Sequence, residues 1–282
     1  MQTFGDFPEH YKTEENAKVL IQPVSYDGTS TWIKGASEGP QAILDASHYL
    51  EWYDIETTSE PFKNGIFTDD IIYPDSSPEQ MVKEIQTNTK HWLNKRKFVI
   101  TIGGEHSVSI GAINAYHEFY KNLTVVQIDA HADLRDSYFG SRYNHACVMS
   151  RVKDSCPIIQ IGIRSIDKSE KEYMDMTRVF WAKDIYNSLN WINELKPLLH
   201  NNVYITIDLD GLDPSIMPST GTPEPGGLNW YQIVSIIKNI NIYSNLVGCD
   251  IVELCPNSQN KAPDFLAAKL IYKLIGYKYV NK

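Results

Sequence analysis

The sequence predicts an α/β fold in which a mostly parallel sheet is covered by helices on both faces. Strand-like runs alternate with helix-like runs along the 282 residues. The strand-like runs are apolar on both faces, as in parallel sheets that are buried between two helical layers. Polar motifs follow the ends of these strands, where such folds place their functional residues. An open doubly wound sheet and a (β/α)₈ barrel both satisfy these observations.

Each expected element is defined by its residue pattern. Short runs rich in β-branched and aromatic residues predict strands, and apolar residues spaced by three and four predict helices. The expected strands lie at 19–23, 65–67, 98–102, 124–128, 158–163, 178–182, 203–207 and 246–252. The expected helices lie at 41–47, from 78 onward, and at 108–120, 146–153, 191–199, 230–238 and 262–275.

Proline and glycine mark several of these boundaries. Pro78 opens the second helix because proline is favoured in the first turn, and Met81, Ile85 and Trp92 are then spaced to share one face. A glycine pair ends the strand at 98–102. There is no internal repeat, low-complexity segment or linker, so we expect one domain over residues 1–282.

Composition limits the classes of protein to which the chain can belong. The hydrophobic fraction of 42% is ordinary for a globular protein, and no apolar run has the length of a membrane span. The first residues are polar and acidic, unlike a secretory signal. Four cysteines without CxxC spacing predict buried reduced thiols. We therefore expect a cytoplasmic protein that does not bind membranes.

The balance of charge argues against nucleic acid as a partner. The formal net charge is -9, which opposes non-specific binding to phosphates and favours solubility. An acidic surface of this kind is compatible with a small cationic substrate. It is also what an ordinary solvated surface provides.

The spacing of ionisable residues in two short segments is the most informative feature. Asp129, His131 and Asp133 alternate in one segment, and Asp208 and Asp210 alternate in another. In an extended chain, side chains two apart share a face, so each set would point the same way. Converging carboxylates repel one another unless cations lie between them. Helix capping would explain a single aspartate but not the alternating set. The pattern predicts a two-metal site that activates water for hydrolysis.

His106 adds a further ligand. It follows a segment containing Gly103 and Gly104, which lets the backbone turn sharply at the strand end so that His106 faces the same crevice as Asp129. Alone, such a histidine is better explained by a structural hydrogen bond; beside the two aspartate motifs, it is a ligand candidate. Asp213 precedes a proline in a turn-like segment and is left out of the site.

The ligand types indicate the metal. Two imidazoles and four carboxylates form an oxygen-rich pair of sites, which suits Mn²⁺ better than Zn²⁺. We expect two Mn²⁺ ions per subunit, about 3.5–4 Å apart. A deacylase with one zinc ion is an alternative by analogy of fold, but it would leave His131 and Asp210 without a role.

Five segments resemble the signatures of the ureohydrolase family, which comprises the arginases and agmatinases. They are GGEHSVSIG, DAHADLRD, DLDGLDPS, GTPEPGGL and DIVELCP, in the order that the family has them. The resemblance implies the open three-layer α/β/α arginase-like fold with a central, mostly parallel eight-stranded sheet, and a homo-oligomer that is a trimer or hexamer. Glu105 stands where many members have aspartate, and Leu44 stands where arginine is usual.

The resemblance also implies the roles of the site residues. The two bridging aspartates would be Asp129 and Asp208. One ion would be held by His106, Asp129, Asp133 and Asp208, and the other by His131, Asp129, Asp208 and Asp210. Asp133 would also bind the hydroxide between the ions. Glu253 would clamp the substrate guanidinium, and His145 would deliver a proton to the leaving amine.

The substrate implied is agmatine, which would be hydrolysed to putrescine and urea by attack of the bridging hydroxide on the guanidinium carbon. The loop at 134–140 lacks the asparagine pattern with which arginases bind an amino acid, and GTPEPGG is the agmatinase form of its motif. Glu224 would face the free amine or only form the rim of a turn. Arg135 could instead bind a carboxylate, as in guanidinobutyrate.

Two alternatives remain. One is hydrolysis of another guanidino or formimino compound, such as arginine, guanidinobutyrate or guanidine. The other is a non-catalytic protein that uses the ureohydrolase fold for assembly or regulation. The intact set of ligands, together with His145 and Glu253, argues against the second.

Overall fold

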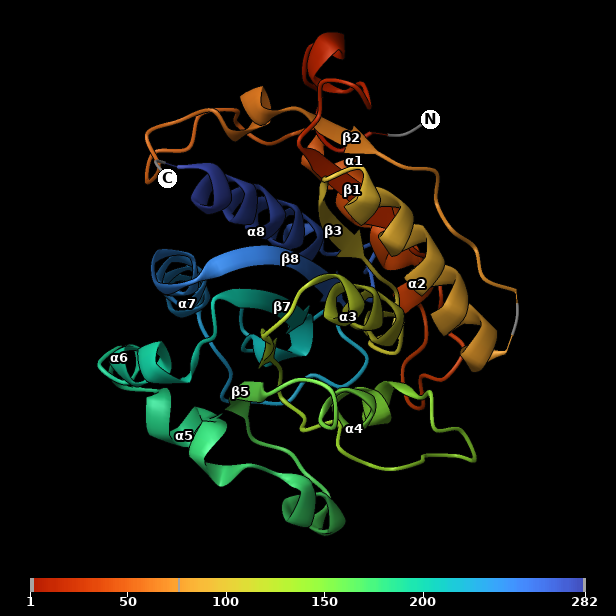
Figure 1. The fold of residues 1–282 in the computed structure, drawn as a ribbon, viewed down its shortest axis with the longest axis vertical. Helices are drawn as coiled ribbons and strands as arrows, with labels where there is room; N and C mark the ends of the chain where they lie inside the picture. The colour runs from red at the N-terminus through yellow and green to blue at the C-terminus, as the bar shows by residue number, and fades with distance from the viewer. Residues whose placement is uncertain (1–2, 76, 281–282) are drawn as a thin grey trace.

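The computed structural model describes residues 3–75 and 77–280. Eight strands form one sheet in the order β2-β1-β3-β8-β7-β4-β5-β6 (Figure 1). Every neighbouring pair of these strands runs parallel. Because β2 and β6 lie at the two edges, the sheet is open. The predicted α/β/α class is confirmed, and the barrel is excluded.

The bounds of the strands agree closely with the expected ranges. The strands are β1 (Val19–Pro23), β2 (Ile66–Thr68), β3 (Phe98–Ile102), β4 (Leu123–Ile128), β5 (Ile158–Ile163), β6 (Val179–Trp181), β7 (Asn202–Asp208) and β8 (Asn245–Val252). The α-helices are α1 (Gly39–Ser47), α2 (Pro78–Asn94), α3 (Val108–Phe119), α4 (Val148–Val152), α5 (Ala182–Ile185), α6 (Ile192–Leu195), α7 (Trp230–Tyr243) and α8 (Ala262–Tyr279). The short 3₁₀ helices are η1 (Glu9–Tyr11), η2 (Ala36–Glu38), η3 (Pro61–Asn64), η4 (His145–Cys147), η5 (Lys168–Tyr173), η6 (Met176–Arg178), η7 (Lys196–Leu198) and η8 (Leu209–Gly211).

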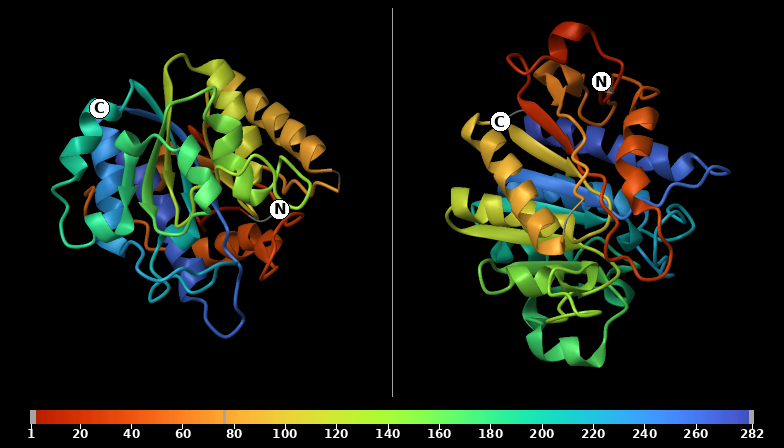
Figure 2. Two further views of the ribbon diagram at one scale, coloured as in Figure 1. Left: turned by 90° about the horizontal axis from the view of Figure 1, so that it is seen from below. Right: turned by 90° about the vertical axis from the view of Figure 1, so that its right-hand side faces the viewer.

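Two helical layers cover the sheet, one on each face (Figure 2). Residues of α1, α7 and α8 belong to one buried cluster, and residues of α2, α3 and α4 belong to the other. The strands contribute to both in alternation: Val19 and Ile21 join the first cluster, and Leu20 joins the second. This two-sided burial is why the strand sequences are apolar without a polar face.

The sheet order gathers the carboxyl ends of four central strands. The chain reaches β3, then starts the other half of the sheet at β4, and later returns to place β7 and β8 between them. The neighbours β3, β8, β7 and β4 are the strands followed by the sequence motifs. Such a reversal of strand order is where open α/β sheets form their crevice.

Several helices begin at residues whose side chains cap them. Ser77 accepts a hydrogen bond from the N–H of Gln80 immediately before Pro78 starts α2. Asn229 and Gln232 each accept from the other's backbone N–H at the start of α7, which forms a capping box.

Some expected elements are wrong in detail. The helix expected at 191–199 is divided into α6 and η7, because Pro197 has no N–H to continue an α-helical ladder. The helix expected at 146–153 begins as η4 and becomes α-helical only at Val148. Neither α5 nor the other 3₁₀ helices were predicted. Cys147, Cys156 and Cys249 are buried thiols as expected, but Cys255 is only half-buried.

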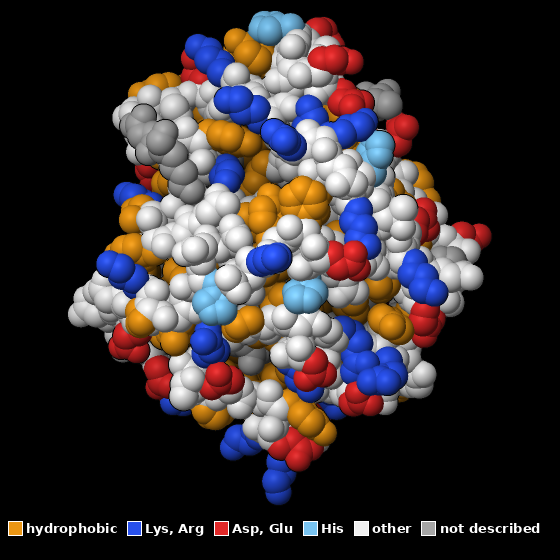
Figure 3. All heavy atoms as spheres, in the orientation of Figure 1, with side chains coloured by type: hydrophobic (Ala, Val, Ile, Leu, Met, Phe, Trp, Pro, Cys, Tyr) orange, Lys and Arg blue, Asp and Glu red, His pale blue; other side chains and the backbone are white. Residues whose placement is uncertain are grey.

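Charged side chains of both signs reach the surface. On the face shown in Figure 3, basic and acidic side chains are interspersed, so this face presents no continuous basic region for a nucleic acid. Within residues 3–75 and 77–280, no helix combines the length and apolar character that crossing a membrane would need.

Candidate active site

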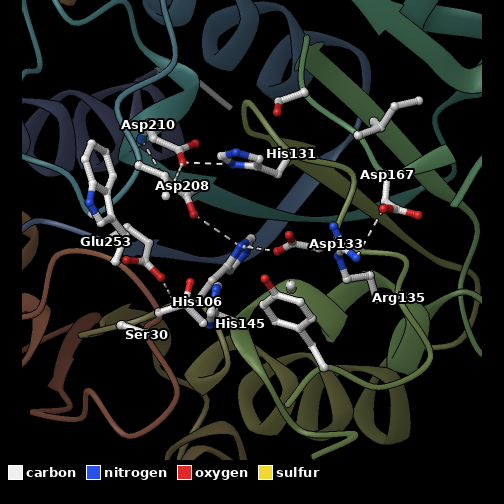
Figure 4. A pocket seen from close by; sticks show the side chains of 18 of the residues that line it. Ser30, His106, His131, Asp133, Arg135, His145, Asp167, Asp208, Asp210 and Glu253 are labelled. Carbon is white, nitrogen blue, oxygen red and sulfur yellow. Dashed lines mark hydrogen bonds and ion pairs between the residues drawn. The ribbon is translucent and has the colours of Figure 1, made fainter. Parts of the chain in front are cut away.

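Most of the sequence-predicted residues line one pocket at the carboxyl ends of the four central strands (Figure 4). The pocket is lined by His106, His131, Asp133, Arg135, His145, Asp208, Asp210 and Glu253, among others. His106 follows β3, Glu253 follows β8, and Asp208 ends β7. Asp129 follows β4 and is fully buried beneath this group.

The first group of possible ligands surrounds the ring of His106. Its Nδ1 atom lies 2.8 Å from Asp133 Oδ2, 3.2 Å from Asp129 Oδ2 and 3.3 Å from Asp208 Oδ2. All four side chains are buried. The turn that brings His106 here depends on Gly104, because a Cβ at that position would lie 1.9 Å from the carbonyl oxygen of Tyr26.

The second group surrounds His131. Its Nδ1 atom lies 3.0 Å from Asp210 Oδ2 and 3.7 Å from Asp129 Oδ1. Asp129 therefore presents one carboxylate oxygen to each histidine. The two groups, one containing Asp208 and the other Asp210, share Asp129, and within each group the ligand atoms lie within 4.8 Å of one another. This is the arrangement that two cations with a bridging carboxylate require.

The site has more carboxylates than the cationic groups of the protein can balance. Burial and the neighbouring carboxylate of Asp129 raise the pKa of Asp133 to about 7. Burial, Asp210 and Asp129 raise the pKa of Asp208 well above its ordinary range. Burial opposes a charge on His131, but Asp210 and Asp129 raise its pKa to about 12. The protein thus holds protons where carboxylates crowd together, and bound divalent cations would displace them.

A buried nitrogen supports the same conclusion. His106 Nδ1 has no hydrogen-bond partner of suitable geometry although it faces three carboxylate oxygens. An imidazole lone pair and several carboxylate oxygens directed at one point are the ligands of a divalent metal ion. The residues present therefore fit a pair of metal ions.

The ligands converge by a different local geometry from the expected one. The alternating spacing predicted a shared face of an extended strand, but β4 ends at Ile128, before the first aspartate. Asp133 adopts a left-handed backbone with φ 54°, and Asp210 lies in η8. Turns at the strand ends, and not strand alternation, bring the carboxylates together.

Two glutamines hold the shared aspartate. Gln127 Nε2 donates to Asp129 Oδ2 over 2.7 Å, and Gln160 Nε2 donates to Gln127 Oε1 over 2.7 Å. Asp210 is held in a similar way, since its carboxylate accepts from Thr222 Oγ1 over 3.1 Å. Hydrogen-bond donors of this kind hold the carboxylates in place before any ion binds.

Glu253 is held in a strained conformation beside the first group. Its φ of 68° is unfavourable for a residue with a long side chain. Its N–H donates to Gly104 O, and its Oε1 accepts from the N–H of His106, both over 2.7 Å. Burial and the nearby charge of Glu105 raise the pKa of Glu253 well above its ordinary range. A cationic group in the pocket would relieve this.

His145 is oriented through Thr29 and Glu105. Glu105 Oε2 accepts from the N–H of Thr29 over 2.5 Å and from that of Ser30 over 2.8 Å, and the Thr29 hydroxyl donates to Glu105 Oε1. Thr29 Oγ1 in turn lies 3.0 Å from the His145 backbone nitrogen and 3.3 Å from Nδ1. Burial and the charge of His106 lower the pKa of His145 to about 4.

The sequence left the roles of Arg135 and Glu224 open, and the structure places these two residues differently with respect to the pocket. Arg135 lines the pocket, but its guanidinium lies over the Tyr138 ring at 4.7 Å and its Nη1 is 3.5 Å from Asp167 Oδ2. Glu224 lies outside the pocket lining, on a half-exposed turn, with its carboxylate 3.9 Å from His131 Nε2. Neither residue is a free charge inside the pocket.

Arg164 is a site-forming residue that sequence reasoning missed. Its Nη2 atom donates to Asp210 O over 2.6 Å and to Glu224 O over 2.7 Å. Asp213, predicted to be a turn residue, accepts from the N–H groups of Gly226 and Gly227 and stays outside the site. These two residues fix the loop at 221–228 against η8.

A second set of missed residues lies inside the strands. Gln127, Thr206 and Asp250 are buried polar residues in strands that are mostly apolar. Each stands near the carboxyl end of its strand. That placement is a signal readable from sequence, because a buried polar side chain in an apolar strand needs a polar partner.

Comparisons with known proteins identify the family of this chain. A model of the arginase family matches residues 17–276. An N(1)-aminopropylagmatine ureohydrolase of Synechocystis is 40% identical over 273 residues, which are 93% of this chain and 89% of that protein. An agmatinase of Pyrococcus horikoshii is 30% identical, with 98% of each chain covered. The agmatine ureohydrolase structure of Thermoplasma volcanium superposes with a TM-score of 0.88 at 30% identity, covering 99% of this chain and 94% of that one. This chain belongs to the arginase family.

Proposed function

We propose that this chain is a ureohydrolase that releases urea from the guanidino end of a linear amine, agmatine or its N(1)-aminopropyl derivative. The observation that carries the proposal is that the Glu253 carboxylate lines the same pocket as the two ligand groups that share Asp129. A guanidinium is resonance-stabilised and reacts only when it is held against an activated water. Glu253 would hold the guanidinium, and the metal site would activate the water.

Glu253 would bind and orient the guanidinium. One of its oxygens already accepts from the N–H of His106, so the other remains to take a charge-assisted hydrogen bond from the substrate. Because the backbone of Glu253 is fixed, the guanidinium carbon would be held above the metal ligands. The attacking water and the substrate would then already be positioned to react.

His145 would move the proton that the leaving amine needs. Its lowered pKa of about 4 keeps the ring neutral near pH 7, so one nitrogen is available to take a proton and pass it on. Thr29 holds the backbone and the Nδ1 side of the ring, which leaves Nε2 as the atom that can serve the pocket.

Two Mn²⁺ ions are the proposed cofactor. His106 and Asp133 would hold one, His131 and Asp210 would hold the other, and Asp129 and Asp208 would be shared by both, as the family resemblance implies. An oxygen-rich set with two imidazoles is typical of Mn²⁺ sites. When bound, such a pair of ions lowers the pKa of water and supplies the nucleophile at neutral pH.

The groups around the pocket favour an amine over a guanidino acid. Arg135 pairs with Asp167 and lies over the Tyr138 ring, so a substrate carboxylate would have to compete with the Asp167 carboxylate for it. Agmatine is the substrate implied by the motifs. The aminopropyl derivative is the second candidate, because the more similar of the two relatives named above is an N(1)-aminopropylagmatine ureohydrolase.

Urea release in the presence of Mn²⁺ tests the proposal. Agmatine, N(1)-aminopropylagmatine, arginine, guanidinobutyrate and guanidine are compared at equal concentration. We expect turnover of the first two and much slower turnover of the others, and the ratio of kcat/KM for the first two decides between them. Preference for guanidinobutyrate would assign Arg135 to substrate binding and overturn the amine specificity.

Asp129→Asn is the control variant. It removes the carboxylate common to both ligand groups, so we expect loss of turnover together with loss of bound metal. Full activity of this variant with two bound ions would contradict the proposed site. Two tightly bound ions in the unaltered chain without urea release from any of the five compounds would support a metal site but not a ureohydrolase.

A further inference from the structure

The Nε2 atom of His106 is connected to a buried hydrogen-bond chain that extends away from the pocket. Nε2 lies 2.9 Å from Thr206 Oγ1, and the Thr206 hydroxyl donates to Asp250 Oδ1 over 2.7 Å. Tyr204 OH donates to the other oxygen, Asp250 Oδ2, over 2.7 Å. The three partners are fully buried. Thr206 and Asp250 are opposite each other in the register of β7 and β8.

The directions of these hydrogen bonds follow from the number of hydrogens. A carboxylate only accepts, so Asp250 takes one hydroxyl hydrogen on each oxygen. Thr206 has a single hydroxyl hydrogen, and its contact with Asp250 Oδ1 at 2.7 Å is much shorter than its contact with Ser109 Oγ at 3.5 Å, so the hydrogen is used toward Asp250. The lone pairs of Thr206 therefore face His106, and Nε2 must carry the hydrogen that occupies the 2.9 Å contact.

The other nitrogen of the ring then has a defined role. With the hydrogen on Nε2, a neutral His106 presents the lone pair of Nδ1 to the oxygens of Asp129, Asp133 and Asp208, at 2.8–3.3 Å. A lone pair among carboxylate oxygens is repulsive unless a cation lies between them. The chain through Thr206 thus favours the form of His106 that a metal ion needs.

We propose that Thr206 and Asp250 are positioning residues that hold His106 in its Nε2–H tautomer and so make Nδ1 a metal ligand. The inference rests on the proposed metal centre and extends it to residues that touch neither ion nor substrate. Asp250 acts through Thr206, and Tyr204 completes the hydrogen bonding of Asp250 without touching His106.

The test measures metal binding and not only turnover. Thr206→Val keeps the shape of the side chain and removes the hydroxyl that links His106 to Asp250. We expect the affinity of one of the two Mn²⁺ ions to fall by about 10- to 100-fold, as when partners of metal-bound histidines are removed. The ion associated with His131 and Asp210 should be retained. At limiting free Mn²⁺, the metal content should fall from two to one, and the electron paramagnetic resonance spectrum should change from a coupled pair to a single ion.

Two variants control for a general effect on the core. Thr206→Ser keeps the hydroxyl and should restore both ions. Tyr204→Phe removes a hydrogen bond from the same buried group but leaves the Thr206 link, so it should also keep both ions. If Thr206→Val does not fold, Thr206→Ala removes the same hydroxyl with less crowding and replaces it in the test.

The outcomes are distinguishable. Loss of one ion in Thr206→Val and its return in Thr206→Ser would support the inference. Wild-type affinity for both ions in Thr206→Val would overturn it, and so would equal losses in Thr206→Val and Tyr204→Phe, which would indicate a purely structural role. An unaltered chain that binds fewer than two ions would overturn the proposed metal centre, and this inference with it.

Discussion

At the scale of single residues, the charge and the shape of Glu253 can be separated experimentally. Glu253→Gln keeps the length of the side chain and an oxygen to accept from the N–H of His106. It removes the negative charge that would clamp a guanidinium. A charge-assisted hydrogen bond contributes about 1.5–3 kcal/mol, so we expect kcat/KM for a guanidino substrate to fall by about 10- to 100-fold.

Metal content provides the check on this prediction. Glu253 is not among the proposed ligands, so Glu253→Gln should bind both ions as the unaltered chain does. Steady-state kinetics with agmatine and metal analysis of the same samples measure the two quantities. Unchanged kcat/KM with full metal content would show that another group binds the guanidinium.

At the scale of elements, Arg164 joins the end of β5 to the turn at η8 and the loop at 221–228. It does so with one planar guanidinium that donates to carbonyl oxygens of both segments. Arg164→Met removes these charge-assisted bonds, so we expect the free energy of local opening of 221–228 to fall by about 1.5–3 kcal/mol. Arg164→Lys should recover only part of it, because an ammonium lacks the planar fork.

Hydrogen exchange of the 221–228 amides measures this opening. Arg178→Met is a matched control, since Arg178 pairs with Asp175 and Leu198 O, in segments that do not include this loop. It should leave exchange at 221–228 unchanged. Unchanged exchange in Arg164→Met would mean that Asp213 alone is sufficient to hold the loop.

The elements also show which features a sequence can reveal. The alternation of strands and helices was predictable because the period of apolar residues is local. The candidate ligands Asp129, His131 and Asp210 were predictable because several metal-binding residue types occur within a few positions. The pairing of Thr206 with Asp250 was not predictable, because it depends on the register between two strands that are separated by α7. Pro197 indicates in the sequence that the helix ends early, but the apolar spacing of 191–199 was followed instead and predicted one continuous helix.

At the scale of the whole molecule, one buried ion cluster ties α8 to the segment before η3. Lys273 Nζ lies 2.8 Å from Asp54 Oδ2 and 2.8 Å from Glu56 Oε2, and Lys273 and Asp54 are buried. Burial acts to raise the pKa values of Asp54 and Glu56, but hydrogen bonds from Lys273 and its charge lower both below their ordinary values of 3.8 and 4.5.

The sign of the pH dependence follows from these directions. A carboxyl group whose pKa is lowered in the folded state stabilises the fold above its ordinary pKa, and this contribution is lost as the pH falls through the lowered value. Lys273→Met leaves Asp54 buried without its partner, which costs about 3–5 kcal/mol near neutral pH. We expect the difference in unfolding free energy between the two chains to shrink below about pH 4.5, as both carboxyl groups take up protons.

Urea denaturation between pH 3 and 7 at one metal concentration measures this difference. Lys269→Met is the control, because Lys269 lies on the same helix with its ammonium over the Tyr272 ring. Its effect should vary with pH less than that of Lys273→Met, because Asp54 and Glu56 act on Lys269 through their charge alone. A pH-independent difference for Lys273→Met would show that the lysine contributes by packing and not by pairing.

The order of the strands has a consequence for how this protein is made. A ribosome delivers β3 and β4 long before β7 and β8, yet the finished sheet places the late strands between the early ones. Until β7 emerges, the nascent chain holds two half-sheets whose inner edges, β3 and β4, have no partner, and the inner edge of β3 has none until β8 emerges. Unpaired apolar edges are prone to wrong pairing and aggregation, so we expect this chain to depend on chaperones during synthesis. No metal centre can exist on the growing polypeptide until its last strands are inserted.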